Sequence, residues 1–179
     1  MPSRHRRQPV KRDIEARAER LATANSAGLM RYFLRRVPNR EDAADLFAET
    51  LLVMWKRIRD MPSDDGEARP WLFGVARRVL SHHHRAGLRR QGLADALRAQ
   101  VAATGEVFGS SPEALTELKA LMAALDELDR EIILLHAWEG FSHEEIAVIM
   151  EMKAPTVRSR YARARAQLRR SYDESRERA

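Results

Sequence analysis

A run of arginines near the C-terminus is the part of this 179-residue sequence best suited to chemistry with another molecule. From Lys153 to Arg170 there are seven basic residues and no acid. Arginine offers a planar pair of donors to guanine O6 and N7 and also neutralises phosphates. Hydroxyls and free amides at a helix N-terminus can hold phosphate as well. These residue types predict contacts with duplex DNA, and the candidates are Thr156, Arg158, Ser159, Arg160 and Arg163.

A helix-turn-helix must position these arginines. Ser142 and Glu145 have the spacing of a capping box, which starts a short helix that runs to Met150. After a turn over residues 151–154, Pro155 opens a second helix. Apolar residues there share one face, so the arginines are expected to project away from the core: Val157, Tyr161, Ala164 and Leu168. A basic helix that is merely solvated, or that rests on an anionic membrane, is the simpler alternative.

Hydrophobic spacing predicts further helices in two blocks, and no segment alternates as a strand would. The first block has a helix over residues 29–37, a second from Glu41, and a third from Pro70 after a loop over residues 61–69. The second block starts near Pro112, and in it Asp129 is expected to cap a helix that Gly140 stops. The fold class is therefore all-α, with two small helical domains joined by a linker, the C-terminal one a helix-turn-helix.

The composition excludes several classes of protein. Hydrophobic residues make up 44% of the chain, and the formal charge is +6. There is no cysteine, which excludes disulfides and thiolate metal sites and fits a reducing, cytoplasmic location. The longest stretch without a charged residue, Leu21 to Met30, is far shorter than the ~20 residues of a membrane span, so no membrane insertion is expected. A secretory signal is not expected either, because no apolar segment follows the basic N-terminus.

Charge is segregated along the chain. Residues 1–12 carry five basic side chains and no acid, which indicates a solvated arm or one that touches nucleic acid or polymerase. Residues 77–90 carry five arginines and three histidines without an acid. This segregation predicts both a polyanion and a basic protein as partners. Acids gather at two other places: Glu41, Asp42, Asp45 and Glu49, and then Glu113, Glu117, Asp126, Glu127, Asp129 and Glu131.

Histidines give the main sign of a different chemistry. His82, His83 and His84 are adjacent, so on a helix they point about 100° apart and cannot readily hold one metal ion. His136 and His143 are expected in or near a packed helix interface. No nucleophile with a paired base and no glycine-rich phosphate cradle is found, so neither enzyme activity, a cofactor nor a metal site is expected. A metal-dependent enzyme that uses the three histidines is kept as an alternative.

Four strings occur in a defined order along the chain: REDAADLFAET from Arg40, PWLFGVAR from Pro70, EEIA from Glu144, and TVRSR from Thr156 followed by RAR from Arg163. Together they resemble a bacterial RNA polymerase sigma factor of the extracytoplasmic-function type, over about two thirds of the chain. The resemblance implies a basic N-terminal arm (1–20), a second sigma domain (21–90), a linker (91–113) and a fourth sigma domain (114–179).

The resemblance also implies roles for these residues, with core RNA polymerase and promoter DNA as partners. An acidic face formed by Glu41, Asp45 and Glu49 would dock on the clamp coiled coil of the polymerase largest subunit. The arginine helix would read the −35 element. The domains of such a chain can pack on each other when it is free, and an anti-sigma factor often enforces that state in this family. Contacts with the −10 element are expected from the loop and the helix after it: Asp64, Asp65, Glu67, Arg77, Arg78 and Arg85.

The chain departs from the family pattern at several positions. Arg78 stands where the family usually has asparagine. Glu151 stands in a turn that usually carries glycine, so the backbone there is expected either to differ from the family's or to be strained. Trp71 could stack on a base, but its place on an apolar stripe favours core packing. A free-standing helix-turn-helix regulator is a further alternative, although it leaves the acidic face and the Trp71 segment without a role.

Overall fold

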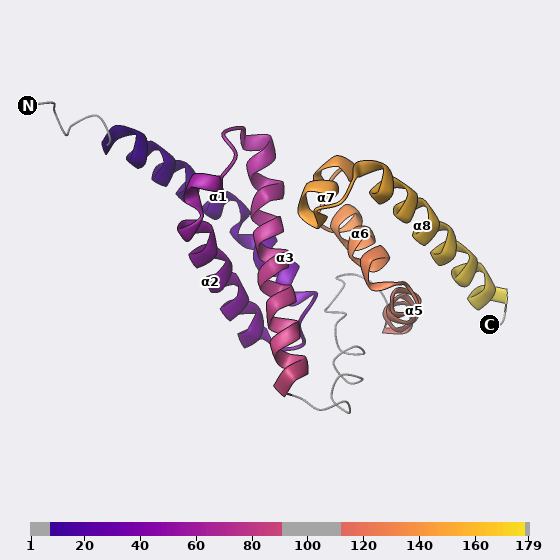
Figure 1. Cartoon of the computed structure of the whole chain (residues 1–179). Coiled ribbons are helices and arrows are strands. Elements are labelled where there is room, and N and C mark those ends of the chain that lie inside the picture. Colours follow the sequence, from indigo (N-terminus) through magenta and orange to yellow (C-terminus); the bar gives the residue numbers. More distant parts are fainter. Residues whose placement is uncertain (1–7, 91–111, 178–179) are drawn as a thin grey trace, which may run out of the picture.

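The computed structural model describes residues 8–90 and 112–177, and the elements in these ranges are helices (Figure 1). They are α1 (Gln8–Leu34), α2 (Arg40–Lys56), the 3-10 turn η1 (Ile58–Asp60), α3 (Asp65–Arg90), α5 (Pro112–Ala123), α6 (Glu127–Ala137), α7 (His143–Met150) and α8 (Ala154–Glu177). We call α1 to α3 the N-terminal domain and α5 to α8 the C-terminal domain. The all-α prediction is confirmed, while the expected linker lies almost wholly outside the described residues. Within the described ranges, no helix has the length and apolar character needed to cross a membrane.

The first helix is longer than the sequence indicates. α1 starts at Gln8, so the segment expected to be a basic arm is helical from residue 8 onward. Ala18 is fully buried, and Arg17 forms an ion pair with Asp65, with 2.8 Å between Nε and Oδ1. The inward face of this segment carries the buried Ala18 and the partly buried Ile14, Leu21 and Ala22, a short apolar stripe among many charged residues. Packing against the rest of the domain stabilises this part of α1, and such packing cannot be predicted from the local sequence.

α2 forms as its hydrophobic spacing predicts. The side-chain oxygen of Asn39 caps the helix by accepting a hydrogen bond from the Glu41 N–H at 2.8 Å. Ala43, Leu46 and Met54 are buried on one side of the helix. Because these apolar residues gather on one side, the acidic residues of the other side remain in water.

α3 begins five residues before its predicted start at Pro70. Asp64 caps it, because Oδ1 of Asp64 accepts hydrogen bonds from the N–H groups of Gly66 (2.7 Å) and Glu67 (3.3 Å). The predicted loop is therefore wrong beyond residue 64, and Asp65 and Glu67 lie in the first helical turn. The preference of proline for the first helical position gave the wrong helix start, because the cap lies six residues before Pro70.

One arginine holds the turn between α5 and α6. Arg130 donates hydrogen bonds to carbonyl oxygens in the last turn of α5 and in the turn that follows it: Met122 (2.8 Å), Ala123 (3.1 Å) and Leu125 (3.0 Å). The N-cap of α6 is Asp126, whose Oδ1 accepts from the Leu128 N–H at 3.0 Å. The prediction that Asp129 is the cap is wrong by one helical turn.

The helix-turn-helix has the predicted capping box. Ser142 Oγ accepts from the Glu145 N–H at 3.2 Å, and Glu145 Oε2 accepts from the Ser142 N–H at 2.7 Å. Gly140, with φ +71°, ends the preceding segment as predicted. Glu151 has a φ of +55° in the turn that follows α7. A left-handed backbone costs a residue with a side chain about 1–2 kcal/mol, so the strain expected at Glu151 is present.

The two domains pack against each other, with α7 of the C-terminal domain facing α3 (Figure 1). Phe73 of α3 meets Phe141 edge to face, with ring centroids 4.9 Å apart. Tyr32 of α1 lies 5.7 Å from Phe73 in the same way. Ile146 and Ile149 of α7 are buried in the same core. One hydrophobic core therefore runs through both domains, and the chain is in the closed arrangement expected of its free form.

Arg130→Met should lower the stability of the C-terminal domain by about 2–3 kcal/mol, because three carbonyl groups lose a charged donor while the side-chain volume is kept. Urea denaturation followed by far-UV circular dichroism measures the change. Arg169→Met, at an exposed position of α8, is the control and should change stability by less than about 0.5 kcal/mol. Equal losses in both variants would contradict this role for Arg130.

Candidate nucleic-acid interface

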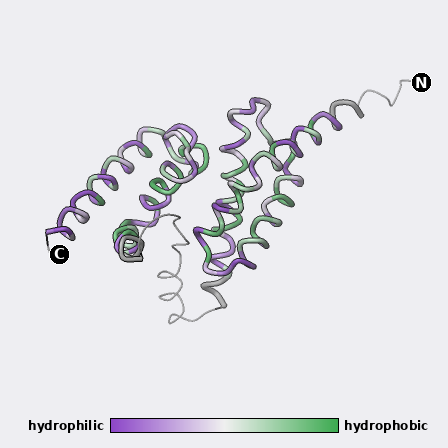
Figure 2. Tube along the Cα trace, turned by 180° about the vertical axis from the view of Figure 1, so that it is seen from behind, coloured by the Kyte–Doolittle hydropathy of each residue, from purple (hydrophilic) through white to green (hydrophobic). Residues whose placement is uncertain are grey.

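α8 presents an exposed polar row opposite a buried apolar one. Val157 and Ala164 are buried, and Figure 2 shows hydrophilic residues along much of the helix. A helix about 10–12 Å across fits the major groove of duplex DNA. Four of the five residues expected to contact DNA lie on the solvent side: Thr156, Arg158, Ser159 and Arg163. Their contact with DNA stays a prediction.

Arg160 differs from the other four because its side chain turns back onto α6. Its Nη1 lies 2.5 Å from Asp129 Oδ1 and 3.2 Å from Asp126 Oδ1. The hydrogen bond with Asp129 raises the pKa of Arg160. The expectation that Arg160 projects away from the core is therefore wrong, and its charge joins α8 to α6.

Arg158 also has an acidic neighbour, but a weaker one. Its Nη1 lies 2.9 Å from Glu144 Oε1, with the two side chains 50% and 68% exposed. Surface pairs of this kind contribute about 0–1 kcal/mol. Arg158 can therefore exchange Glu144 for a phosphate or a base at little cost.

An aromatic cluster supports the start of α8. The rings of His136 and His143 stack with centroids 5.0 Å apart, and each lies 4.7 Å from the Tyr161 ring. His136 Nδ1 is also 2.9 Å from the Phe141 carbonyl oxygen. The prediction that both histidines lie at a helix interface is confirmed. Because the cluster joins α6, α7 and α8, it fixes the direction in which α8 presents its exposed row.

α2 carries a second surface of opposite charge. Glu41, Asp45 and Glu49 are all exposed, and none of them forms an ion pair within the described ranges. Leu52, 60% exposed, continues the same helical face three residues after Glu49. Sequence reasoning missed Leu52, although it lies off the apolar stripe that the pattern assigned to the core. Carboxylates repel phosphates, so this exposed acidic face suits a protein partner better than a nucleic acid.

The acidic candidates at the start of α3 have structural partners. Asp64 caps the helix, and Asp65 binds Arg17. Glu67 is exposed in the first turn. The three carboxylates therefore lie at the start of one helix, and two of them make contacts that stabilise the domain.

The basic candidates of α3 lie further along the helix. Arg78 forms an ion pair with Glu151, and this hydrogen bond lowers the pKa of Glu151. Arg77 is half-buried, and Arg85 donates from Nε to the Ser81 carbonyl oxygen at 3.1 Å. The expected base-stacking residue, Trp71, is partly buried against the hydrophobic core, as its place on the apolar stripe predicts.

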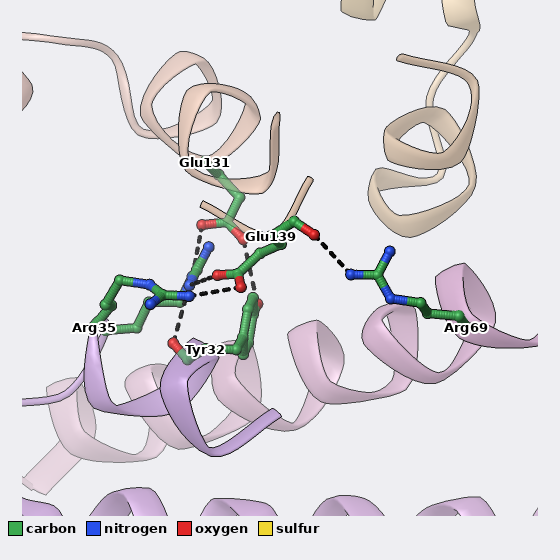
Figure 3. A network of polar contacts seen from close by, with 6 residues as sticks. Tyr32, Arg35, Arg69, Glu131 and Glu139 are labelled. Carbon is green, nitrogen blue, oxygen red and sulfur yellow. Dashed lines mark hydrogen bonds and ion pairs between the residues drawn. The ribbon is translucent and has the colours of Figure 1, made fainter. Parts of the chain in front are cut away.

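A buried polar network between the domains was not foreseen from the sequence (Figure 3). Glu139 lies at its centre, with Oε2 2.6 Å from Arg35 Nη2 and Oε1 3.3 Å from Arg36 Nη1. Arg36 Nε also lies 3.0 Å from Glu131 Oε2. Arg69 of α3 donates to the Glu139 carbonyl oxygen at 2.7 Å. The sequence holds only two signs of this network. They are the adjacent Arg35 and Arg36, and Glu139, an acid that stands alone in a turn beside aromatic residues.

Protonation in this network is fixed by burial and charge. Burial, followed by the Glu131 carboxylate, raises the pKa of Tyr32 well above its ordinary value, so the hydroxyl stays protonated and donates to Glu131 Oε1 at 3.3 Å. Burial alone would lower the pKa of Arg36, but Glu131, Tyr32 and Glu139 outweigh it and raise the pKa. Arg36 therefore stays charged while only 5% of its side chain is exposed.

The histidine run on α3 does not form a compact site. The rings of His83 and His84 are 6.1 Å apart and tilted, while His82 is exposed. Within the described residues, no group of three or more His, Asp or Glu side chains could hold a metal ion.

Comparison with known protein families matches two separate parts of the chain. The family model "Sigma-70 region 2" matches residues 21–90, and "Sigma-70, region 4" matches residues 115–168. RNA polymerase sigma factor NccH of Alcaligenes xylosoxydans xylosoxydans is 36% identical over 71% of this chain and 71% of its own. ECF RNA polymerase sigma factor SigL of Mycobacterium tuberculosis is 30% identical over 76% of this chain and 77% of its own.

Solved structures share the fold of both domains. The sigma factor RpoE of Bartonella quintana, solved in complex with the anti-sigma factor NepR, has a TM-score of 0.64 and 25% identity, covering 90% of this chain and 97% of its own. CnrH, solved with the cytosolic domain of CnrY, has a TM-score of 0.61 at 22% identity, over 91% and 97% of the two chains.

Arg163→Ala should weaken binding to a cognate DNA duplex, selected from a random library with this chain, by about 1–3 kcal/mol without loss of stability. Arg160→Ala should instead destabilise the C-terminal domain, since it leaves Asp129 without its partner. Fluorescence anisotropy of the labelled duplex and urea denaturation separate the two effects. If Arg163→Ala leaves both affinity and selectivity unchanged, the face of α8 assigned to DNA is the wrong one.

Proposed function

The chain belongs to the sigma-70 family of RNA polymerase sigma factors, in its extracytoplasmic-function group, and we propose that its two domains read the two elements of one promoter. As a sigma factor it binds core RNA polymerase and directs promoter-specific initiation of transcription. In this proposal α8 reads the −35 element, and the N-terminal domain contacts and helps to open the −10 region. The observation that best supports the proposal is the exposed row of Arg158, Ser159 and Arg163, which follows the capped helix α7 and its turn.

At the −35 element, α8 would enter the major groove with its N-terminal half. Arg158 and Arg163 can each offer a fork of donors to guanine. Thr156 and Ser159 lie close enough to the helix start to bond phosphate. Arg160 would act indirectly, because its bonds to Asp126 and Asp129 set the angle of α8 on the domain.

At the −10 element, the residues that open α3 and the arginines along it would hold the separated strand. Extruding a base from the stack costs a few kcal/mol, which contacts to the base and the backbone must offset. Arg77, Arg78 and Arg85 supply positive charge for the backbone. Glu67 is available to accept from base amino groups, whereas Asp64 and Asp65 would have to leave their present partners first.

The acidic face of α2 would dock on core polymerase. Its carboxylates attract a basic partner, and Leu52 adds apolar area that is buried only on docking. The proposed domain limits are 21–90 and 114–179, with the linker 91–113 between them, and α1 extends the first domain back to Gln8. The arm of residues 1–20 would then be largely part of that domain.

Two further features complete the proposal. In this proposal the chain leaves catalysis to the polymerase and acts in the cytoplasm, which fits the absence of cysteine from its sequence. An anti-sigma factor is a partner, because the similar RpoE of Bartonella quintana was solved with the anti-sigma factor NepR. Transcription with core polymerase alone tests the function: a free-standing regulator would give no promoter-specific start without another sigma factor.

Asp45→Lys with Glu49→Lys should reduce core polymerase binding at least tenfold, because the reversed charges repel a basic partner. Duplex DNA binding by α8 should stay unchanged. Surface plasmon resonance on immobilised core polymerase and anisotropy with duplex DNA give the two readings. Asp13→Lys with Glu19→Lys, an equal charge reversal on exposed positions of α1, is the control. Parallel loss of polymerase and DNA binding would indicate unfolding and contradict the assignment.

A further inference from the structure

Within the described residues, Glu144 is the acid that forms an ion pair with the exposed row of α8. It lies in the first turn of α7, and its Oε1 is 2.9 Å from Nη1 of Arg158. Arg163, the other arginine of the row, has no ion pair in the same ranges. The proposed function treats the two arginines alike and gives Glu144 no role. Because an acid opposes the general attraction of a basic surface for DNA, its place beside the row needs an explanation.

Both side chains start from firmly held points of the backbone. The capping box of Ser142 and Glu145, with hydrogen bonds of 3.2 Å and 2.7 Å, holds the turn that carries Glu144. Val157, directly before Arg158, is fully buried and fixes the first turn of α8. Groups that stand on regular, packed elements keep their mutual position better than groups on loops. The backbone therefore keeps the carboxylate and the guanidinium opposite each other, although both side chains are exposed.

Arg158 can bind a base without leaving Glu144. A guanidinium carries several N–H donors, and the bond to Glu144 uses Nη1 alone. Donors therefore remain for the fork that arginine offers to guanine. The carboxylate likewise has a second oxygen, Oε2, which takes no part in this bond. The pair presents donors from Arg158 beside an acceptor from Glu144.

The pair is better suited to a base than to a phosphate. A phosphate attracts an isolated arginine, but a carboxylate next to that arginine repels it. Arg158 and Glu144 together carry no net charge, so the pair gains less from the DNA backbone than Arg163 does. The edge of a base pair is neutral and carries both donors and acceptors, which the two side chains can satisfy at once.

One base pair matches the order of these groups. In the major groove guanine offers the acceptors N7 and O6, and the paired cytosine offers its N4 amino donor beside them. Arg158 can bind both acceptors while Glu144 accepts from N4. An A·T pair places the adenine amino donor toward the arginine and the thymine O4 acceptor toward the carboxylate. Each member of the pair would then meet a group of its own kind.

We propose that Glu144 and Arg158 act as one unit that reads a single G·C pair of the −35 element, with Arg158 on guanine and Glu144 on the N4 amino group of the paired cytosine. The inference rests on the proposed function, because it requires α8 to lie in the major groove. It adds Glu144 of α7 as a specificity-determining residue. It also gives the two arginines of the row different tasks, since Arg163 has no acid that keeps it from a phosphate.

The first test measures discrimination at that base pair. Selection from a random duplex library with the full chain gives the preferred sequence, and selection with Arg158→Ala identifies the pair at which the preference for guanine is lost. Anisotropy then compares the preferred duplex with duplexes that carry each of the other three pairs at this position. Glu144→Ala should reduce the discrimination at least tenfold, because Arg158 alone accepts other pairs that offer it an acceptor.

Binding to duplexes of unrelated sequence should change in the opposite direction. Without Glu144, Arg158 is free to bind a phosphate, so Glu144→Ala should bind such duplexes more tightly. The slope of log affinity against log salt concentration should steepen by about 0.9 for the phosphate newly bound. Loss of discrimination together with this gain distinguishes a reader of bases from a simple source of affinity.

Altered bases test the two contacts one at a time. At the identified pair, 7-deazaguanine removes the N7 acceptor, and 2-pyrimidinone in place of cytosine removes the N4 amino group. The unchanged chain should bind each altered duplex at least fivefold more weakly. Glu144→Ala should lose its sensitivity to the pyrimidinone and stay sensitive to 7-deazaguanine. Inosine in place of guanine alters only the minor groove and is the control duplex.

Glu127→Ala is the matched control variant. Glu127 is exposed in the first turn of α6, as Glu144 is in the first turn of α7 of the same domain. The substitution removes the same charge from an equivalent place in a helix. It should leave both the discrimination at the G·C pair and the sensitivity to the pyrimidinone unchanged. Urea denaturation establishes that both variants are folded.

Two results would overturn the inference. If Glu144→Ala tightens binding to every duplex by the same factor, Glu144 only repels the backbone. If the unchanged chain and Glu144→Ala respond equally to the pyrimidinone, Glu144 does not contact cytosine. Failure of the proposed function gives a different result: the unchanged chain then selects no duplex and supports no promoter-specific transcription by core polymerase, which would overturn both.

Discussion

The buried carboxylate of Glu139, shared by Arg35 and Arg36, is the interaction that fixes how the two domains fit against each other. The Glu139 side chain is 3% exposed. Removing either the carboxylate or its arginine partners would therefore leave the opposite charge buried and unpaired, which costs several kcal/mol of stability. The intact pair, however, gains little over water, because desolvation offsets most of the attraction. The network therefore specifies how the domains fit together without making their contact permanent. Separation returns every charge to solvent or to a new partner, whereas a purely apolar interface would offer no such exchange.

Local signals in the sequence predicted the elements that stand on one helix or one turn. The capping box of Ser142 and Glu145, the stop at Gly140 and the strain at Glu151 each depend on residues within four positions of one another. The exposed row of α8 and the acidic face of α2 follow from helical spacing alone. For this reason the all-α fold and most of the candidate DNA row were predictable.

The errors arose where a long-range contact decided the local outcome. The start of α1 is held by packing of Ile14, Ala18 and Leu21 against the core and by the ion pair of Arg17 with Asp65, which is 48 positions away. Arg160 was assigned to DNA by its place among arginines, but Asp129, 31 positions away, turns it onto α6. Arg36 and Glu131 are 95 positions apart, and nothing in their local patterns connects them. The segregated acids as a whole indicated a basic protein partner, and one of them, Glu131, instead meets Arg36 of the same chain.

The placement of these contacts also orders the events of opening. The closed contact uses α3 and the end of α1, while the acidic carboxylates of α2 remain exposed, and Figure 1 shows α2 beside α1 and α3 with the C-terminal domain beyond α3. The acidic face of α2, which we propose as the polymerase-binding surface, is therefore accessible without displacement of the C-terminal domain. The exposed row of α8 is likewise uncovered while the chain is closed. Of the proposed DNA contacts, that of Arg78 requires the domains to separate, because Arg78 binds Glu151 in the closed chain. The proposed function therefore implies that docking on polymerase comes before opening, because the surface proposed for docking is already free in the closed chain.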